Sequence, residues 1–261
     1  MASFPLSTVD PLEKLRTTPQ LGPRAKPLPL GIQSLDAALP DAGLPRGGVV
    51  EIGSPAGLGG ATRLALAACV SAQRVSANKS IDGECAWCAW IDSSNTLYAP
   101  GAIQAGIDLE RLLVVRPDPE DIARIAVRIT TSGVFSVVVI DRSGVPGAEL
   151  GNTRARWTIA VRRLALAAEA NNTTILLLST TSVARKESLP TAMRIELSRP
   201  RYDRLSLRIT KDRRGRLSGP IAIDSRDLFR VRQATAGSSV TGSSVTGSST
   251  TEPPKTLHLL P

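Results

Sequence analysis

A glycine-rich stretch at residues 53–60, GSPAGLGG, constrains the fold of this chain more than any other part of its sequence. An apolar run from Val49 to Ile52 precedes it and is typical of a buried strand. The segment ATRLALAACV follows it from Ala61 and has the composition of a helix. A strand, a glycine loop and a helix in this order form a cradle for phosphate, because backbone N–H groups and the helix N-terminus point toward the anion.

The loop departs from the working phosphate motif at its two reactive positions. That motif, G-x-x-x-x-G-K-[ST], uses a lysine to reach the phosphates and a hydroxyl to bind Mg²⁺. Aligned on the second glycine, the chain has Gly60 in place of the lysine and Ala61 in place of the hydroxyl. We therefore expect no cofactor, with binding of ATP and Mg²⁺ disfavoured. A degenerate nucleotide site of this kind would consist of Ser54, Gly57, Gly59, Gly60, Ala61, Thr62 and Asp141.

Asp141 enters that set because it ends VFSVVVID, the strongest strand pattern in the chain. An aspartate in this place holds Mg²⁺ in P-loop enzymes, and the alternative is a cap on the turn after the strand. Cys85 and Cys88 form a lone C-x-x-C inside another apolar run, and we interpret them as strand residues rather than zinc ligands.

Strand and helix patterns alternate along most of the chain. Further apolar runs lie at residues 85–92, 112–115 and 174–178, separated by helical patterns. This alternation predicts a parallel α/β sheet. Later segments at 194–198, 205–211 and 221–223 alternate apolar and polar residues, as antiparallel strands do. We therefore predict an α/β fold with a mainly parallel sheet, flanking helices and antiparallel C-terminal strands.

Composition divides the chain into three parts. Residues 1–29 are rich in proline and turn residues, which predicts a flexible arm, either disordered or docked on a neighbouring subunit. Residues 30–233 form the predicted domain, entered by a short helix at 30–39 with Ser34 as its N-cap. Residues 234–261 are a predicted flexible tail with a repeated VTGSS, and its apolar end is a plain terminus or a docking peptide.

The charge of the chain favours an anionic partner. Its net charge is +9 and its pI is near 10.2, which points to nucleic acid before membrane, with an acidic protein as the alternative. No apolar stretch reaches the length of a membrane span, and MASFPLSTVD does not have the pattern of a signal peptide. Three cysteines give no even disulfide set, so we expect a cytoplasmic protein.

Much of the positive charge lies in one segment. Residues 185–216 hold eleven Arg or Lys against four Asp or Glu. Such a cluster suits a phosphate backbone, and a solvated basic sheet edge is the alternative. The predicted DNA contacts in its basic turn are Lys211, Arg213, Arg214 and Arg216.

Four segments of the chain resemble bacterial RecA in their order and spacing: GIQSLDAALPDAGLPRGGVVEIGSP, CAWIDSSN, GIDLERLLVVRPD and SGVFSVVVID. The resemblance covers about residues 30–181 and implies a RecA-like P-loop NTPase fold. Within that superfamily the chain is most similar to the ImuA group of mutagenesis accessory proteins, on its LPRG at 44–47 and its KDRRGR at 211–216. The cell-division inhibitor SulA is a second relative.

The same resemblance identifies departures from RecA at its catalytic positions. Gly60 and Ala61 replace the loop lysine and threonine, Ser94 replaces the glutamate that orients water, and Thr181 replaces the glutamine that senses the γ-phosphate. Only Asp141 matches its counterpart. Since phosphoryl transfer depends mostly on electrostatic stabilisation, these losses predict a chain that is not an enzyme.

The resemblance to the ImuA group implies a non-catalytic adaptor in translesion synthesis during the SOS response to DNA damage. Its expected partners are an inactive, ImuB-like homologue of Y-family polymerases and an error-prone replicative-type polymerase, with DNA or RecA as further partners and no membrane. Arg154 and Arg156 correspond to the first DNA-contacting loop of RecA. The alternatives are an active RecA-type DNA-dependent ATPase, or recombinase, and a SulA-like inhibitor.

Overall fold

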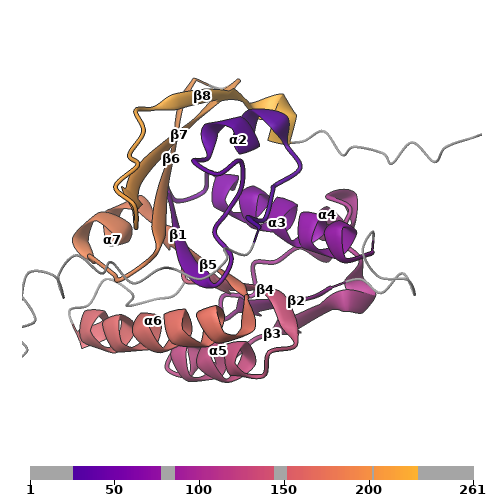
Figure 1. Cartoon of the computed structure of the whole chain (residues 1–261), viewed down its shortest axis with the longest axis vertical. Coiled ribbons are helices and arrows are strands. Elements are labelled where there is room, and N and C mark those ends of the chain that lie inside the picture. The colour runs from indigo at the N-terminus through magenta and orange to yellow at the C-terminus, as the bar shows by residue number, and fades with distance from the viewer. Residues whose placement is uncertain (1–25, 78–85, 144–151, 202, 229–261) are drawn as a thin grey trace, which may run out of the picture. The chain divides into compact units, whose positions relative to one another are not determined.

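The computed structural model of the chain describes residues 26–77, 86–143, 152–201 and 203–228. Its centre is an eight-stranded sheet with the order β3-β2-β4-β5-β1-β6-β7-β8 (Figure 1). The strands are β1 (Gly48–Ser54), β2 (Trp87–Asp92), β3 (Leu112–Val115), β4 (Phe135–Asp141), β5 (Thr174–Thr180), β6 (Met193–Arg201), β7 (Arg204–Asp212) and β8 (Ile221–Asp224).

Strands β1 to β6 pair in parallel with their neighbours in the sheet, β7 pairs antiparallel with β6, and β8 pairs antiparallel with β7. This arrangement confirms the predicted fold class. Strand β1 lies between β5 and β6, and all of its seven residues are buried. The carboxyl end of β1, where the glycine loop begins, is therefore near the middle of the sheet.

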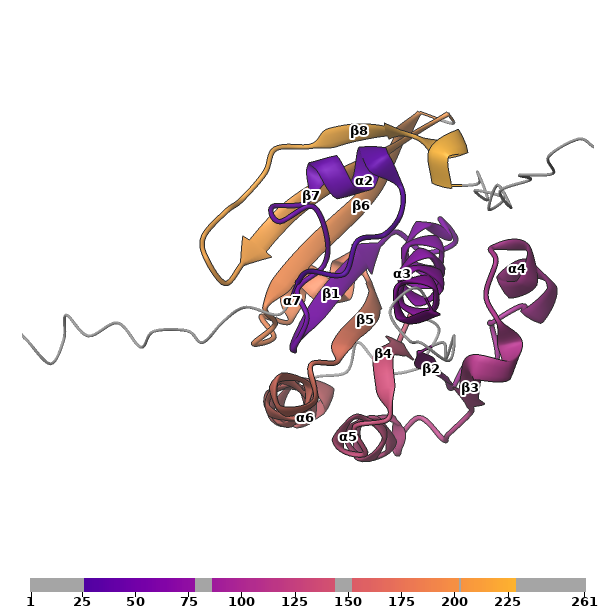
Figure 2. The same cartoon turned by 45° about the vertical axis from the view of Figure 1, so that its right-hand side comes forward.

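Helices cover both faces of the sheet (Figures 1 and 2). The helices are α2 (Gln33–Ala38), α3 (Gly60–Ala77), α4 (Ala99–Gln104), α5 (Ile122–Thr131), α6 (Asn152–Asn171) and α7 (Thr181–Lys186), with single 3-10 turns at Leu109–Arg111 and Ser225–Leu228. On the α3 face, Val50 and Ile52 of β1 join the core of α2 and α3. On the other face, Val49 joins the core of α5 and α6, as the two-residue period of a strand requires.

Helix α7 and the segment that follows it lie on the α6 face, against β1. A Cβ atom on Gly53 would be 3.2 Å from the Cβ of Ala184 in α7, so the glycine permits this close approach. Leu189, beyond α7, is fully buried in the same core as α6. The connection from β5 to β6 is therefore part of the packed domain.

At the start of the described chain, residues 26–29 belong to the domain, although the sequence analysis assigned them to the arm. Leu28 is fully buried, and its backbone exchanges two hydrogen bonds with Leu44, at 2.8 and 2.7 Å. The predicted N-cap Ser34 is wrong, because helix α2 begins after Ile32 and the Ser34 hydroxyl donates to Asp227 instead, at 3.0 Å. The rest of the predicted arm and the whole predicted tail lie outside the described residues.

Across the described ranges, no helix combines the length and the apolar composition that crossing a membrane needs.

Candidate functional site

The glycine loop joins β1 to α3 at the carboxyl end of the sheet, as the sequence predicts. Gly57 and Gly59 have φ values of +72° and +68°, a left-handed conformation that favours glycine. A Cβ atom at either position would meet no atom within 4 Å, so the outer side of the loop is open. The Leu58 N–H donates to the Pro55 carbonyl at 3.2 Å, and the Ser54 hydroxyl donates to the same carbonyl at 3.3 Å.

The first turn of α3 packs tightly where the motif has its lysine. A Cβ atom on Gly60 would be 3.3 Å from Leu197 Cδ1 and 3.4 Å from Leu205 Cδ1. These two leucines belong to β6 and β7, and Ala61 beside Gly60 is buried as well. Thr62, one residue on, is half-buried. The antiparallel strands therefore fill the space around position 60 with apolar side chains.

Two carboxylates end neighbouring strands at this edge. Asp92 of β2 and Asp141 of β4 are register partners and are both buried. Asp92 accepts hydrogen bonds from the backbone N–H groups of Thr96 and Leu97, both at 2.9 Å. Asp141 accepts from the backbone N–H of Ser143 at 2.9 Å and from the hydroxyl of the same residue. Each carboxylate thus fixes the turn after its strand.

Three buried hydroxyls at the same edge have no hydrogen-bond partner in the described part of the chain. They belong to Ser93 and Ser94 after β2 and to Thr181 after β5. Buried hydroxyls are normally hydrogen-bonded, so each of these groups is available to a ligand or to water. Ser94 and Thr181 are the positions that the resemblance to RecA matched to catalytic side chains. In open parallel sheets, ligands bind at the carboxyl ends of the strands.

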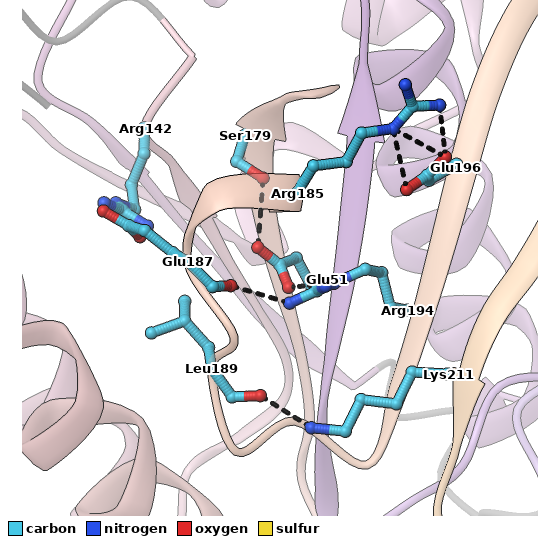
Figure 3. Close-up of polar contacts among 9 residues, drawn as sticks. All are labelled: Glu51, Arg142, Ser179, Arg185, Glu187, Leu189, Arg194, Glu196 and Lys211. Carbon is cyan, nitrogen blue, oxygen red and sulfur yellow. Dashed lines mark hydrogen bonds and ion pairs between the residues drawn. The ribbon is translucent and has the colours of Figure 1, made fainter. Parts of the chain in front are cut away.

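A cluster of charged side chains lies around Glu51 and Glu187 (Figure 3). Glu51, in the middle of β1, is fully buried and accepts from Arg194 Nε of β6 at 2.7 Å. Arg194 also donates to the backbone carbonyl of Glu187 at 2.8 Å. The Glu187 carboxylate pairs with Arg142 at 3.1 Å, and both side chains are buried. Four charged residues, on β1 and β6 and just after α7 and β4, are therefore connected, in part through the Glu187 backbone.

Burial shifts the pKa values of Glu51 in this cluster and of Lys211 in β7. It raises the pKa of Glu51, and the positive charge and hydrogen bond of Arg194 oppose that rise. It lowers the pKa of Lys211, and the charge of Arg194 lowers that pKa further. The Lys211 ammonium donates to the Leu189 carbonyl at 2.6 Å, which ties β7 to the connection after α7 (Figure 3).

Arg142 and Glu51 are buried charged residues near the site that the sequence did not single out. The Arg142 guanidinium lies 4.1 Å from the ring centroid of Trp157 in α6, and its Nη2 has no hydrogen-bond partner among the described residues. Glu51 carried a usable signal, because a carboxylate inside an apolar strand needs a buried partner. Nothing in the sequence named that partner.

The residues predicted to bind DNA fall into different environments. Arg214 and Arg216 pair with Asp41 at 3.2 and 2.7 Å. Hydrogen bonds from Arg216 to Asp41 and, second, to Asp212 raise the pKa of Arg216. Arg213 is exposed. Lys211 points inward, as described above. In α6, Arg156 is exposed and its Nη2 donates to the Glu120 carbonyl at 3.1 Å, and the side chain of Arg154 lies outside the described residues.

A mainly parallel α/β sheet with a glycine loop after its central strand defines the class of P-loop-type proteins. Residues 20–180 match the family described as the RecA N-terminal domain. That match spans more than half of the chain, and the chain belongs to this family. The predicted RecA-like resemblance is thereby confirmed.

Individual relatives match a shorter stretch. The protein RecA of Kineococcus radiotolerans is 38% identical over 139 residues, which cover 52% of this chain and 37% of the relative. That of Acidothermus cellulolyticus is 41% identical over 126 residues, 47% of this chain and 34% of the relative. That of Leifsonia xyli subsp. xyli is 35% identical over 164 residues, 58% of this chain and 43% of the relative. The chain thus spans well under half the length of the relatives it matches.

These relatives overturn the prediction that the chain is not an enzyme. They carry the name of RecA, a DNA-dependent ATPase, and at this modest identity they point to enzyme activity. The prediction rested on the side chains missing at Gly60, Ala61, Ser94 and Thr181. Catalysis of phosphoryl transfer is electrostatic, so its positive charge can come from another part of the chain or from a second molecule.

Proposed function

We propose that this RecA-family chain acts in DNA-damage-induced translesion synthesis, where it connects an error-prone polymerase complex to DNA. Its partners are then an ImuB-like homologue of Y-family polymerases, an error-prone replicative-type polymerase and DNA. The resemblance of LPRG and KDRRGR to the ImuA group is the starting point of this proposal.

The connection between β5 and β6 is the observation that carries it. In RecA a DNA-contacting loop follows the fifth strand. Here the connection is the six-residue helix α7 and a short segment to Met193. Arg194 and Lys211 each donate a hydrogen bond to a carbonyl of that segment, and Leu189 anchors it in the core. A connection held in this way favours docking to a partner over lining a recombination filament.

The β6–β7 hairpin supports contact with DNA. Arg201 and Arg204 are exposed and lie directly opposite each other on the two strands. Like charges in such a cross-strand pair destabilise a sheet, and a phosphate between them would remove the repulsion. This pair lies at the hairpin tip, at the opposite end of β7 from Lys211, and is a DNA contact additional to those predicted from the sequence.

A deletion of the gene tests the proposal. Damage-induced mutation frequency should fall severalfold while homologous recombination stays at the wild-type level, because a polymerase adaptor serves only lesion bypass. In parallel, the full-length chain should bind the purified ImuB-like protein. A deletion that abolishes recombination and leaves mutagenesis intact would contradict the proposal, as would cell filamentation as the main effect of overexpression.

A RecA-type DNA-dependent ATPase is the second candidate, and the names of the relatives favour it. Its measurement is ATP hydrolysis by the purified chain, with and without single-stranded DNA. DNA-stimulated turnover together with a recombination defect supports this second function. ATP hydrolysis by the chain in cells whose recombination is intact would instead mean that the adaptor itself uses ATP.

A further inference from the structure

A cavity of about 350 Å³ lies beside the glycine loop, on the face of the sheet that carries α7. Pro55 of the loop forms one wall, and Thr181 and Arg185 of α7 form a second. The β6–β7 hairpin supplies the remaining side through Ser198, Ser206 and Arg208. The volume is at the lower end of the range for small-molecule sites.

Arg208 is the second cationic residue of this cavity besides Arg185, and its side chain is exposed. Its register partner across the hairpin is Glu196. Both oxygens of that carboxylate, however, are taken by Arg185, at 3.3 Å from Nε and 2.8 Å from Nη2 (Figure 3). Within the described residues, no hydrogen bond or ion pair engages the Arg208 side chain. A planar guanidinium without a carboxylate partner is suited to bind an oxyanion through two parallel N–H donors.

Three hydroxyl groups line the same cavity. Ser198 and Ser206 are register partners on β6 and β7, and Ser206 is buried. Thr181 adds the buried hydroxyl without a partner that was described above. With Arg185 neutralised by Glu196, the lining carries one net positive charge and three groups able to donate hydrogen bonds. This donor set matches a phosphate oxyanion better than a neutral or cationic ligand.

We propose that this cavity, which adjoins the glycine loop at Pro55, is a phosphate-ester site in which Arg208 holds the oxyanion and the hydroxyls of Ser198, Ser206 and Thr181 orient it. All of these residues lie beyond residue 180, where the match to the RecA N-terminal domain ends. The proposed anion-holding residues therefore lie after the matched range, and the proposal does not depend on the translesion role. The phosphate belongs to a free nucleotide or to a nucleic-acid backbone.

The test compares wild-type chain with Arg208→Gln in binding to three probes: inorganic phosphate, ATP and a twelve-residue oligothymidylate. Arg162→Gln is the matched control, because Arg162 is an exposed arginine on α6, away from the cavity. Isothermal titration gives the affinities, and amide chemical shifts of Ser198 and Ser206 report occupancy. Since Arg208 has no partner in the described chain, its replacement should leave the melting temperature unchanged.

We expect Arg208→Gln to lose at least tenfold in affinity for ATP, for the oligonucleotide or for both. Arg208→Lys should recover part of that affinity, and Arg162→Gln should bind as the wild type does. Loss for ATP alone identifies a nucleotide site, and loss for the oligonucleotide alone identifies a backbone phosphate. Equal binding of all probes by wild type and Arg208→Gln would overturn the proposal. So would unshifted Ser198 and Ser206 amides at saturating probe.

Discussion

Glu51 is a carboxylate in the middle of the sheet, and its surroundings determine what it contributes. Its side chain is fully buried, and Arg194 is its cationic partner at 2.7 Å. A buried pair of this kind adds little net stability, but removal of one partner leaves a charge without compensation. The cluster therefore makes the connection after α7 depend on its charges as well as on its apolar core.

Replacement of Arg194 by methionine should lower the free energy of unfolding by about 3–5 kcal/mol at pH 8. Burial already raises the pKa of Glu51. A carboxyl whose pKa is raised in the folded state contributes most stability at low pH and loses it as pH rises through the folded pKa. The defect of Arg194→Met should therefore be smaller at pH 5, where Glu51 is able to take up a proton. Urea unfolding at both pH values measures this.

Arg185→Met is the matched control for that experiment. Arg185 pairs with Glu196 as closely as Arg194 pairs with Glu51, but its side chain is largely exposed. Solvent screens such a pair, so its loss should change stability little at either pH. Equal effects of the two substitutions would contradict the role given to burial.

Restoring the loop chemistry is a second test at single residues. Gly60→Lys with Ala61→Thr should raise ATP affinity by about tenfold, since a charge-assisted hydrogen bond contributes about 1.5–3 kcal/mol. Crowding of the new Cβ by Leu197 and Leu205 removes part of that gain. Fluorescent-nucleotide titration measures the affinity. An unchanged affinity would mean that the loop does not face bound phosphate.

Among the elements, the segment from Leu28 to Leu44 depends on one small residue. A Cβ atom on Gly43 would lie 2.6 Å from the backbone carbonyl oxygen of Leu28. Gly43→Ala should break the bridge to Leu44 and lower stability by about 1–3 kcal/mol. Gly219→Ala, where a Cβ atom meets nothing within 4 Å, is the control. Thermal unfolding of both variants distinguishes the two sites.

The turn between β7 and β8 is held by ion pairs. Arg216 pairs with Asp212 at 2.8 Å and with Asp41 at 2.7 Å. The pKa of Asp212 is lowered: burial acts to raise it, but the hydrogen bonds and charge of Arg216 lower it more. A lowered carboxyl pKa gives stability above its ordinary pKa that is lost as pH falls. Arg216→Gln should therefore destabilise the chain more at pH 7 than at pH 3, as measured by urea unfolding.

Helices and strands could be predicted where the residues of one continuous segment are enough to determine its secondary structure. The runs ending at Ile52 and Asp141 are strands because apolar residues continue through them, and the glycine loop follows from its glycines. Contacts between distant segments were not predictable. Nothing in KDRRGR indicates that Asp41 forms ion pairs with two of its arginines. Likewise, the partner of Glu51 lies on a strand that the chain reaches only at Met193.

For the whole molecule, the distribution of arginines predicts how DNA binding responds to salt. Arg201→Gln with Arg204→Gln should reduce the slope of log affinity against log salt by about 1.4 for single strands, at about 0.7 for each phosphate contact. Arg214→Gln should change the slope less, because Arg214 already pairs with Asp41. Fluorescence anisotropy at several salt concentrations gives both slopes. Equal slopes for the two variants would place the DNA elsewhere.

The place of β1 in the sheet also determines when the domain can form. Both neighbours of β1 come late in the chain, since β5 begins at Thr174 and β6 at Met193. At roughly 5–20 residues per second, the ribosome needs on the order of ten seconds to supply them. During that interval both edges of the nascent strand β1 are unpaired, and unpaired strand edges promote aggregation. The yield of folded protein should therefore depend on chaperones that bind β1 until β6 has been synthesised.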